Sequence, residues 1–110
     1  MSDIPILTTP IIEGAKVTKY IGIVTARNVR GINVIRDFMT AFRDFFGGRS
    51  GSYEEVMVDM ENEVISEIAE QAKLMGGNAV IGFALDFDNI GSKNKSLLMA
   101  HGKGTAVIIE

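Results

Sequence analysis

The stretch GGRSGS, residues 47–52, decides the fold because it separates two amphipathic helical patterns. Gly47 and Gly48 suit the end of the first helix, since a glycine often follows the last helical turn. Ser52 suits the start of the second helix, where a hydroxyl can accept a hydrogen bond from an unpaired amide. The sequence on either side of these two helices reads as strand, so a helical hairpin is expected between two strand regions.

The segment before this stretch has the apolar spacing of one helical face. Asn33 is a suitable N-cap, and the polar face carries the pairs Arg36-Asp37 and Arg43-Asp44, which lie almost above one another because seven residues make nearly two turns. The apolar positions are Ile35, Phe38, Met39, Phe42, Phe45 and Phe46.

The segment after the stretch predicts a long helix. Ser52 and Glu55 fit a capping box, and a pair of glycines, Gly76 and Gly77, supplies the stop signal. The helix is expected to run for about 23 residues, roughly 35 Å. Its apolar stripe consists of Tyr53, Met57, Met60, Val64, Ile68 and Met75, with Val56, Ile65, Ala69 and Ala72 beside it.

The composition is that of a single domain, residues 1–110, without a disulfide framework, because the chain has 110 residues and no cysteine. A reducing cytoplasm is the expected location. We find no signal-peptide pattern and no apolar run long enough to span a bilayer, so a soluble, unprocessed protein is expected. The net charge of −3 argues against nucleic-acid binding, which needs clustered Lys and Arg.

Charge is distributed unevenly along the chain. All five arginines precede the second helix, whereas that helix holds half of the 14 acidic residues. One interpretation is a solvated acidic face with Arg partners nearby. The other is head-to-tail pairing between an Arg-rich and an acidic surface of different copies. The acidic residues are Glu54, Glu55, Asp59, Glu61, Glu63, Glu67 and Glu70.

Four extended segments flank the helices. Residues 6–9 form a short piece closed by Pro10, and residues 16–30 form a strand with both faces expected to be covered. Residues 79–88 form a third strand, residues 89–95 a solvated loop, and residues 96–109 the last strand. Gly102 and Gly104 interrupt it, which suggests a bulge or a close approach of another backbone.

The fold class is therefore α+β, in the order β-β-α-α-β-β, with an antiparallel sheet packed on a helical hairpin that contains one long helix. A helix of roughly 35 Å reaches across a domain whose expected radius of gyration is about 13 Å. Since 46% of the residues are apolar, we expect the excess apolar surface to be buried between subunits.

Over nearly its full length the chain resembles the YbjQ-like family, whose members are catalogued as uncharacterised or as heavy-metal-binding domains. The matching motifs are Thr8-Thr9-Pro10, Ile12-Glu13-Gly14, Tyr20-Ile21-Gly22-Ile23-Val24, Arg36-Asp37-Phe38, Arg43-Asp44, residues 47–51 with Tyr53-Glu54, residues 77–82, Asp86 with Asp88, and Gly104-Thr105-Ala106-Val107.

This resemblance implies a dodecin-like subunit assembled into a ring, with a pentamer as the expected form. It also carries the family's metal label. The segment from Asp88 to Ser96 is shorter than the usual hairpin. His101 and Lys103 also differ from the family pattern, which tends to have small residues at these positions.

A metal site has few candidate ligands in this sequence. Soft metals prefer Cys and His at set spacings, and the chain has no Cys and only His101. The methionines at helical apolar positions suit core packing. Asp86 and Asp88 share one face of their strand by the period of two and could contact a hard cation. The metal candidates are therefore Asp86, Asp88 and His101, and all three are weak.

Catalysis is not indicated by any constellation of residues, because a serine triad needs a base and an orienting acid together. The strongest ligand-binding candidate is the central turn, where Gly48, Arg49, Ser50 and nearby Asp37 could hold an anion at the helix start. The structural alternative is that Arg49 makes an ion pair at an interface.

We therefore expect a non-enzymatic, cytoplasmic homo-oligomer that binds a small anion or metabolite or serves in assembly. No cofactor is assigned, and neither nucleic acid nor membrane is an expected partner. One alternative is an enzyme with an inter-subunit site near Arg49, Ser50 and Asp37. The other is a metal-binding protein, as the family label suggests.

Overall fold

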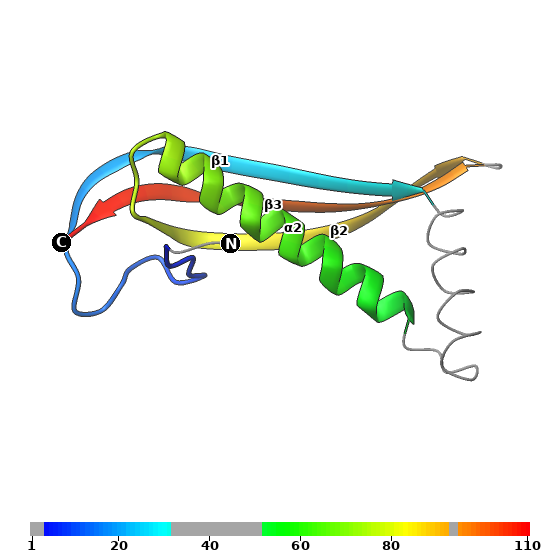
Figure 1. Ribbon diagram of the computed structural model, residues 1–110, viewed down its shortest axis with the longest axis horizontal. Helices are drawn as coiled ribbons and strands as arrows, with labels where there is room; N and C mark the ends of the chain where they lie inside the picture. Colours follow the sequence, from blue (N-terminus) through cyan, green and yellow to red (C-terminus); the bar gives the residue numbers. More distant parts are fainter. Residues whose placement is uncertain (1–3, 32–51, 93–94) are drawn as a thin grey trace.

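The computed structural model describes residues 4–31, 52–92 and 95–110. These residues form β1 (Val17–Gly31), α2 (Ser52–Leu74), β2 (Ala79–Ser92) and β3 (Lys95–Ile109). The strands make one antiparallel sheet in the order β1-β3-β2, and α2 crosses one of its faces obliquely (Figure 1). The α+β class is thus confirmed, with a sheet of three strands and one helix in the described part of the chain.

The expected order β-β-α-α-β-β differs from this structure at two points. The first expected helix, built on Ile35 to Phe46, lies outside the described residues. Residues 6–9 do not form a strand of their own, because their backbone hydrogen bonds to β2 make one isolated parallel bridge, between Ile6 and Val80, and no continuous ladder. Pro5 and Pro10 flank this segment and cannot donate to a ladder, which limits its pairing.

The long helix matches its prediction and ends in a Schellman motif. α2 spans 23 residues, and Gly76 follows it with φ of 92°, a left-handed conformation that favours glycine. The Gly77 amide donates to the carbonyl of Ala72 at 2.8 Å, and the Gly76 amide donates to that of Lys73 at 2.9 Å. These two bonds are the pair that defines the motif, so the glycine stop signal acts as expected.

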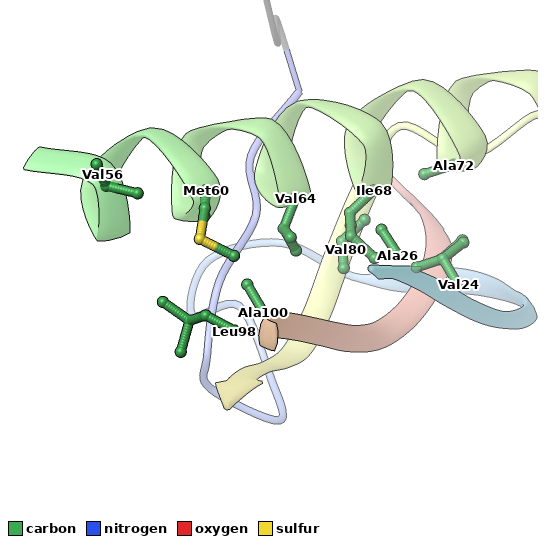
Figure 2. Packing of buried hydrophobic residues seen from close by; sticks show 11 residues of the cluster. Val24, Ala26, Val56, Met60, Val64, Ile68, Ala72, Val80, Leu98 and Ala100 are labelled. Atoms are coloured by element: carbon green, nitrogen blue, oxygen red, sulfur yellow. The ribbon is translucent and has the colours of Figure 1, made fainter. Parts of the chain in front are cut away.

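The main core lies between α2 and the sheet, and a smaller cluster of Ala79, Ile81 and Val107 is buried on the other face, with Ile12 packed against it. Residues at a spacing of four along α2 point toward the strands (Figure 2), where they meet small and branched side chains. Met57 and Ile65 flank this stripe and are only half buried. The helix residues of this buried cluster are Val56, Met60, Val64, Ile68 and Ala72, and their main strand neighbours are Val24, Ala26, Val80, Leu98, Ala100 and Ala106.

Small residues of the central strand let α2 approach closely. Ala100, Gly102, Gly104 and Ala106 are all buried on the side of β3 that faces the helix. A Cβ atom added at Gly102 would lie only 2.5 Å from Cγ1 of Val64. The expectation of a bulge or of another backbone at Gly102 is therefore wrong, because the side chains of Val64 and Phe83 make the close approach.

A bulge in β2 sets which of its side chains face the helix. Ile81 pairs with Thr105 and Ala84 pairs with Lys103, so Gly82 and Phe83 together oppose Gly104 alone. Gly82 has φ of 62°, which suits a bulge that begins with glycine. The extra residue shifts the alternation by one. Phe83, Leu85 and Phe87 consequently pack against the core, while Asp86 and Asp88 are exposed.

The N-terminal segment covers part of the outer edge of β2. The amide of Leu7 donates to the carbonyl of Val80 at 2.9 Å, and the amides of Gly82 and Phe83 donate to carbonyls of Thr9 and Leu7. These bonds satisfy backbone groups of the bulged edge that would otherwise be unpaired.

Two expectations about the strands differ from the structure of the single chain. β1 was expected to be covered on both faces, but within one chain Ile23, Thr25 and Arg27 are exposed between the buried Val24 and Ala26. Residues 89–92 were expected to form a loop, yet β2 continues to Ser92, opposite Lys95. Pairing along the whole of β3 outweighs the loop-like composition of this segment, which is a tertiary effect.

Candidate functional site

The face of the sheet opposite α2, called the far face below, carries a row of three polar residues. Alternate residues of β3 point away from the helix, and His101 lies in the middle of this set. The register places Arg27 of β1 directly opposite His101 on one side and Asp86 of β2 directly opposite it on the other. Arg27, His101 and Asp86 are called the polar row below.

The geometry of paired strands fixes the spacing within this row. Directly opposite residues have Cβ atoms about 5 Å apart, so the imidazole of His101 is within reach of both neighbours. Arg27 and Asp86 are two strands apart, roughly 10 Å, with the histidine between them. The row thus holds a cation, a hydrogen-bonding ring and a carboxylate in that order.

The Nε2 atom of His101 is buried and has no hydrogen-bond partner among the described residues. Buried polar atoms of side chains are normally paired, so an unpaired one calls for a physical explanation. Arg27 and Asp86 are themselves exposed and can change rotamer. The polar row is therefore an incompletely satisfied site that a bound group or a side-chain rearrangement could complete.

The three weak metal candidates lie together on the far face. Asp88 stands one row beyond Asp86, opposite Met99, roughly 7 Å along the strand. Asp86 and Asp88 lie on one face of β2, as the period of two predicts. His101 lies on the same face, because β3 places it directly opposite Asp86. Within the described ranges, no three His, Cys, Asp or Glu side chains come close enough to hold one metal ion.

Apolar side chains border the polar row on both sides. Ile23 is 77% exposed and Val29 is 50% exposed on β1, while Ile90 and Leu97 lie on the same face at the hairpin end. Exposed apolar groups that border a polar site are typical of binding or assembly surfaces. The row is thus set in an apolar surface that no other described element covers.

A second polar cluster lies on the helix side of the sheet. Arg30 Nη2 donates to Glu63 Oε1 at 2.9 Å, and Asn28 Nδ2 donates to the other oxygen of the same carboxylate. Gln71 Nε2 donates to the carbonyl of Thr25 at 2.6 Å. These contacts connect α2 to the edge strand β1, so their role is structural.

The remaining predicted site residues, Asp37, Gly48, Arg49 and Ser50, lie outside the described residues. Arg27 was not predicted as a site residue. The signal that could have found it is the alternation in β1, in which Ile23, Thr25, Arg27 and Val29 occupy one face. That signal was hidden because the residues on both faces of β1 include apolar side chains.

The chain is similar to known proteins over nearly its whole length. A family model for YbjQ proteins, described as "Putative heavy-metal-binding", matches residues 4–110. The chain belongs to the YbjQ family. A UPF0145 protein from Carboxydothermus hydrogenoformans is 47% identical over 103 residues, which cover 94% of each chain.

A solved structure supports the fold of this YbjQ family member. The crystal structure of a protein of unknown function from Pediococcus pentosaceus, assigned to the DUF74 family, superposes with a TM-score of 0.66. The match covers 97% of this chain and 98% of the other at 18% identity, so the likeness concerns the fold alone. Across the described residues, none of the helices combines the length and apolarity that a membrane span requires.

Proposed function

We propose that this YbjQ family chain is the subunit of a homo-oligomeric ring, with a pentamer as the expected form, that binds a small ligand and is not an enzyme. The observation that carries the proposal is the far face, which exposes Ile23, Val29, Ile90 and Leu97 around the polar row. A subunit that buried this surface against other copies would remove apolar area from water.

The dimensions of the chain support assembly. Its radius of gyration is 16.9 Å, whereas a compact domain of this length has one of about 13 Å. An elongated subunit buries less of its own apolar surface, so more remains for contacts between copies. In the described part of the chain, one strand before the long helix and two paired strands after it also suit the dodecin-like class of subunits.

The polar row supports a ligand that carries an anionic group and a hydrogen-bonding group. Arg27 can pair with a carboxylate or phosphate, and the unpaired Nε2 of His101 can donate or accept a hydrogen bond, depending on its tautomer. Asp86, on the other side of His101, would repel a second anionic group of the ligand. A small metabolite with groups of both signs therefore fits best.

A second candidate is a metal site shared between copies. Asp86, Asp88 and His101 share one face but do not form a site within the described part of one chain. Ligands from a neighbouring copy would be needed to complete the coordination. Zinc and copper(I) accept histidine, whereas a hard cation would use the carboxylates.

Native mass spectrometry of the metal-free protein, incubated with a panel of metals and metabolites, tests these proposals because it reports subunit count and bound mass together. Sedimentation at micromolar concentration should give a species several times 11.9 kDa. Arg27→Ala and His101→Ala should each remove ligand binding, while Lys16→Ala, at an exposed position just before β1, serves as the matched control. A helical monomer would refute the oligomer, and a ligand retained in both far-face variants would refute the polar row.

A further inference from the structure

Charge is segregated between the elements in a way that suits contact between copies. β1 and β3 together contain five Lys or Arg residues and no acidic residue, whereas β2 contains Asp86 and Asp88 and no base. α2 contains seven acidic residues and one Lys, located in its last turn. One chain therefore presents an acidic helix and a basic pair of strands.

The acidic surface lies on the side of α2 that faces away from the sheet, called the outer face below. Exposed acidic side chains follow this face along the helix, among them Glu55, Asp59 and Glu70. Val58 adds an apolar contact and is 49% exposed. Glu63 is the acid that Arg30 of the same chain pairs with.

The basic surface lies on the far face over β1 and β3. Arg27 and Lys103 are exposed there in adjacent rows, and Ile23 and Val29 provide apolar contacts on either side of Arg27. The acidic residues of the far face, Asp86 and Asp88, stand on β2. The half of this face made by β1 and β3 is thus complementary to the outer face of α2 in charge and in apolar content.

The dimensions of the two surfaces also agree. A helix with its side chains is about 10 to 12 Å wide, and two adjacent strands span roughly 10 Å. The length of α2, about 35 Å, is shorter than the roughly 50 Å of a 15-residue strand such as β1. A helix can therefore lie over β1 and β3 and leave the acids of β2 at its edge.

We propose that the outer face of α2 from a second copy docks on the β1–β3 half of the far face. The proposal rests on the homo-oligomer proposed above and specifies which surfaces form its interface. Because the two surfaces differ, the contact is head-to-tail and repeats from copy to copy, which closes a ring or extends a filament. The neighbour's helix then borders the polar row, so the ligand site proposed above lies between two subunits.

The absence of cysteine from the sequence allows a direct test by cross-linking. Ser66 is exposed on the outer face of α2, and Thr25 is exposed on β1. Ser66→Cys combined with Thr25→Cys, treated with a short bismaleimide, should give a ladder of covalent multimers that ends at the native subunit count. Each single-cysteine variant should give few covalent multimers.

The matched control uses the other edge of the same row. Thr25 and Ala84 both lie opposite Lys103, on β1 and β2 respectively, and both are exposed. Ser66→Cys combined with Ala84→Cys should therefore couple far less than the Thr25 pair. Equal or stronger coupling through Ala84 would overturn the placement of the helix.

The other outcomes separate this inference from the proposed function. Covalent dimers from Thr25→Cys alone would show far faces packed on one another, and dimers from Ser66→Cys alone would show helices paired; either overturns the inference while leaving an oligomer. An oligomer in which no pair couples also overturns it. A monomer by sedimentation under the same conditions would overturn the proposed assembly as well.

Charge reversal gives an independent readout. Arg27→Glu with Lys103→Glu should weaken assembly about tenfold or more, because acids would then face acids across the interface. Asp59→Lys with Glu70→Lys should weaken it similarly, and combining all four changes should restore assembly. Failure of the combined variant to assemble better than either pair would contradict the docking.

Discussion

Gly102 should not tolerate even one added methyl group, because Val64 of α2 occupies the space in front of it. The Cβ of Gly102→Ala would lie 2.5 Å from Val64 Cγ1 and 3.1 Å from Phe83 Cε1. Val64 is fully buried, and its branched side chain has few rotamers to move to. The helix must therefore shift away from the sheet, or the valine must strain.

The size of the effect follows from the cost of overpacking a core, which is typically 1 to 3 kcal/mol. We expect Gly102→Ala to lower the free energy of unfolding by about 2 kcal/mol and the melting temperature by roughly 8 °C. Val64→Ala alone should cost about 2 to 3 kcal/mol, because it removes two buried methyl groups and leaves a cavity.

The double variant distinguishes this mechanism from a general loss of stability. In Gly102→Ala with Val64→Ala, the added methyl group occupies space that the valine vacated, so the combined cost should fall about 2 kcal/mol below the sum. Urea unfolding at one fixed chain concentration gives all four stabilities. Gly31→Ala is the control, since among the described residues its Cβ would meet only Leu97 Cδ2 at 3.9 Å.

Additive costs in the double variant would refute the proposed contact. So would a Gly102→Ala protein as stable as the wild type. Gly31→Ala should stay within about 0.5 kcal/mol of the wild type, as substitutions without a clash usually do. A large loss in that control would show that alanine is poorly accepted in these strands for reasons unrelated to Val64.

Three further predictions concern local contacts. Gly82→Ala should lower the free energy of unfolding by about 1 to 2 kcal/mol, since φ of 62° disfavours a Cβ. If urea unfolding showed no loss of stability, the left-handed conformation at the bulge would be contradicted. Asn78→Ala should cost about 1 kcal/mol, because it removes two hydrogen bonds to the backbone of Ile109, at 3.0 and 2.8 Å. Arg30→Ala should cost about 0.5 to 1 kcal/mol, less at high salt, since the Glu63 side chain is 53% exposed. Thermal unfolding of Arg30→Ala and of the wild type, with and without added salt, measures this difference.

Local patterns predicted those parts of the fold that depend on neighbouring residues. The helix, its glycine stop and the extent of β3 follow from periodicity and from Gly76 and Gly77. The strand order did not follow, because β1 pairs with residues about 80 positions away and no local signal specifies that partner. The extension of β2 to Ser92 was missed for the same reason.

The arrangement of the candidate site depends on the bulge in β2, which the alternation of the sequence did not predict. Without the bulge at Gly82 and Phe83, strict alternation from Ile81 would turn Asp86 toward α2. The prediction that Asp86 and Asp88 share a face holds in either case. Which face they share, and that His101 stands beside them, follows only from the register. The anion site predicted at Arg49 and Ser50 lies outside the described residues and stays a prediction.

The central position of β3 has a consequence for how the chain folds during synthesis. β1 and β2 do not pair with each other, so each needs the last strand to complete its ladder. At 5 to 20 residues per second, the roughly 80 residues between the end of β1 and the end of β3 take about 4 to 16 s to make. Through that interval the emerging β1, with Ile23 and Val29, has no native ladder partner. We expect nascent chains stalled before β3 to be held by chaperones or degraded, and folding to be complete only once Ile109 has left the ribosome.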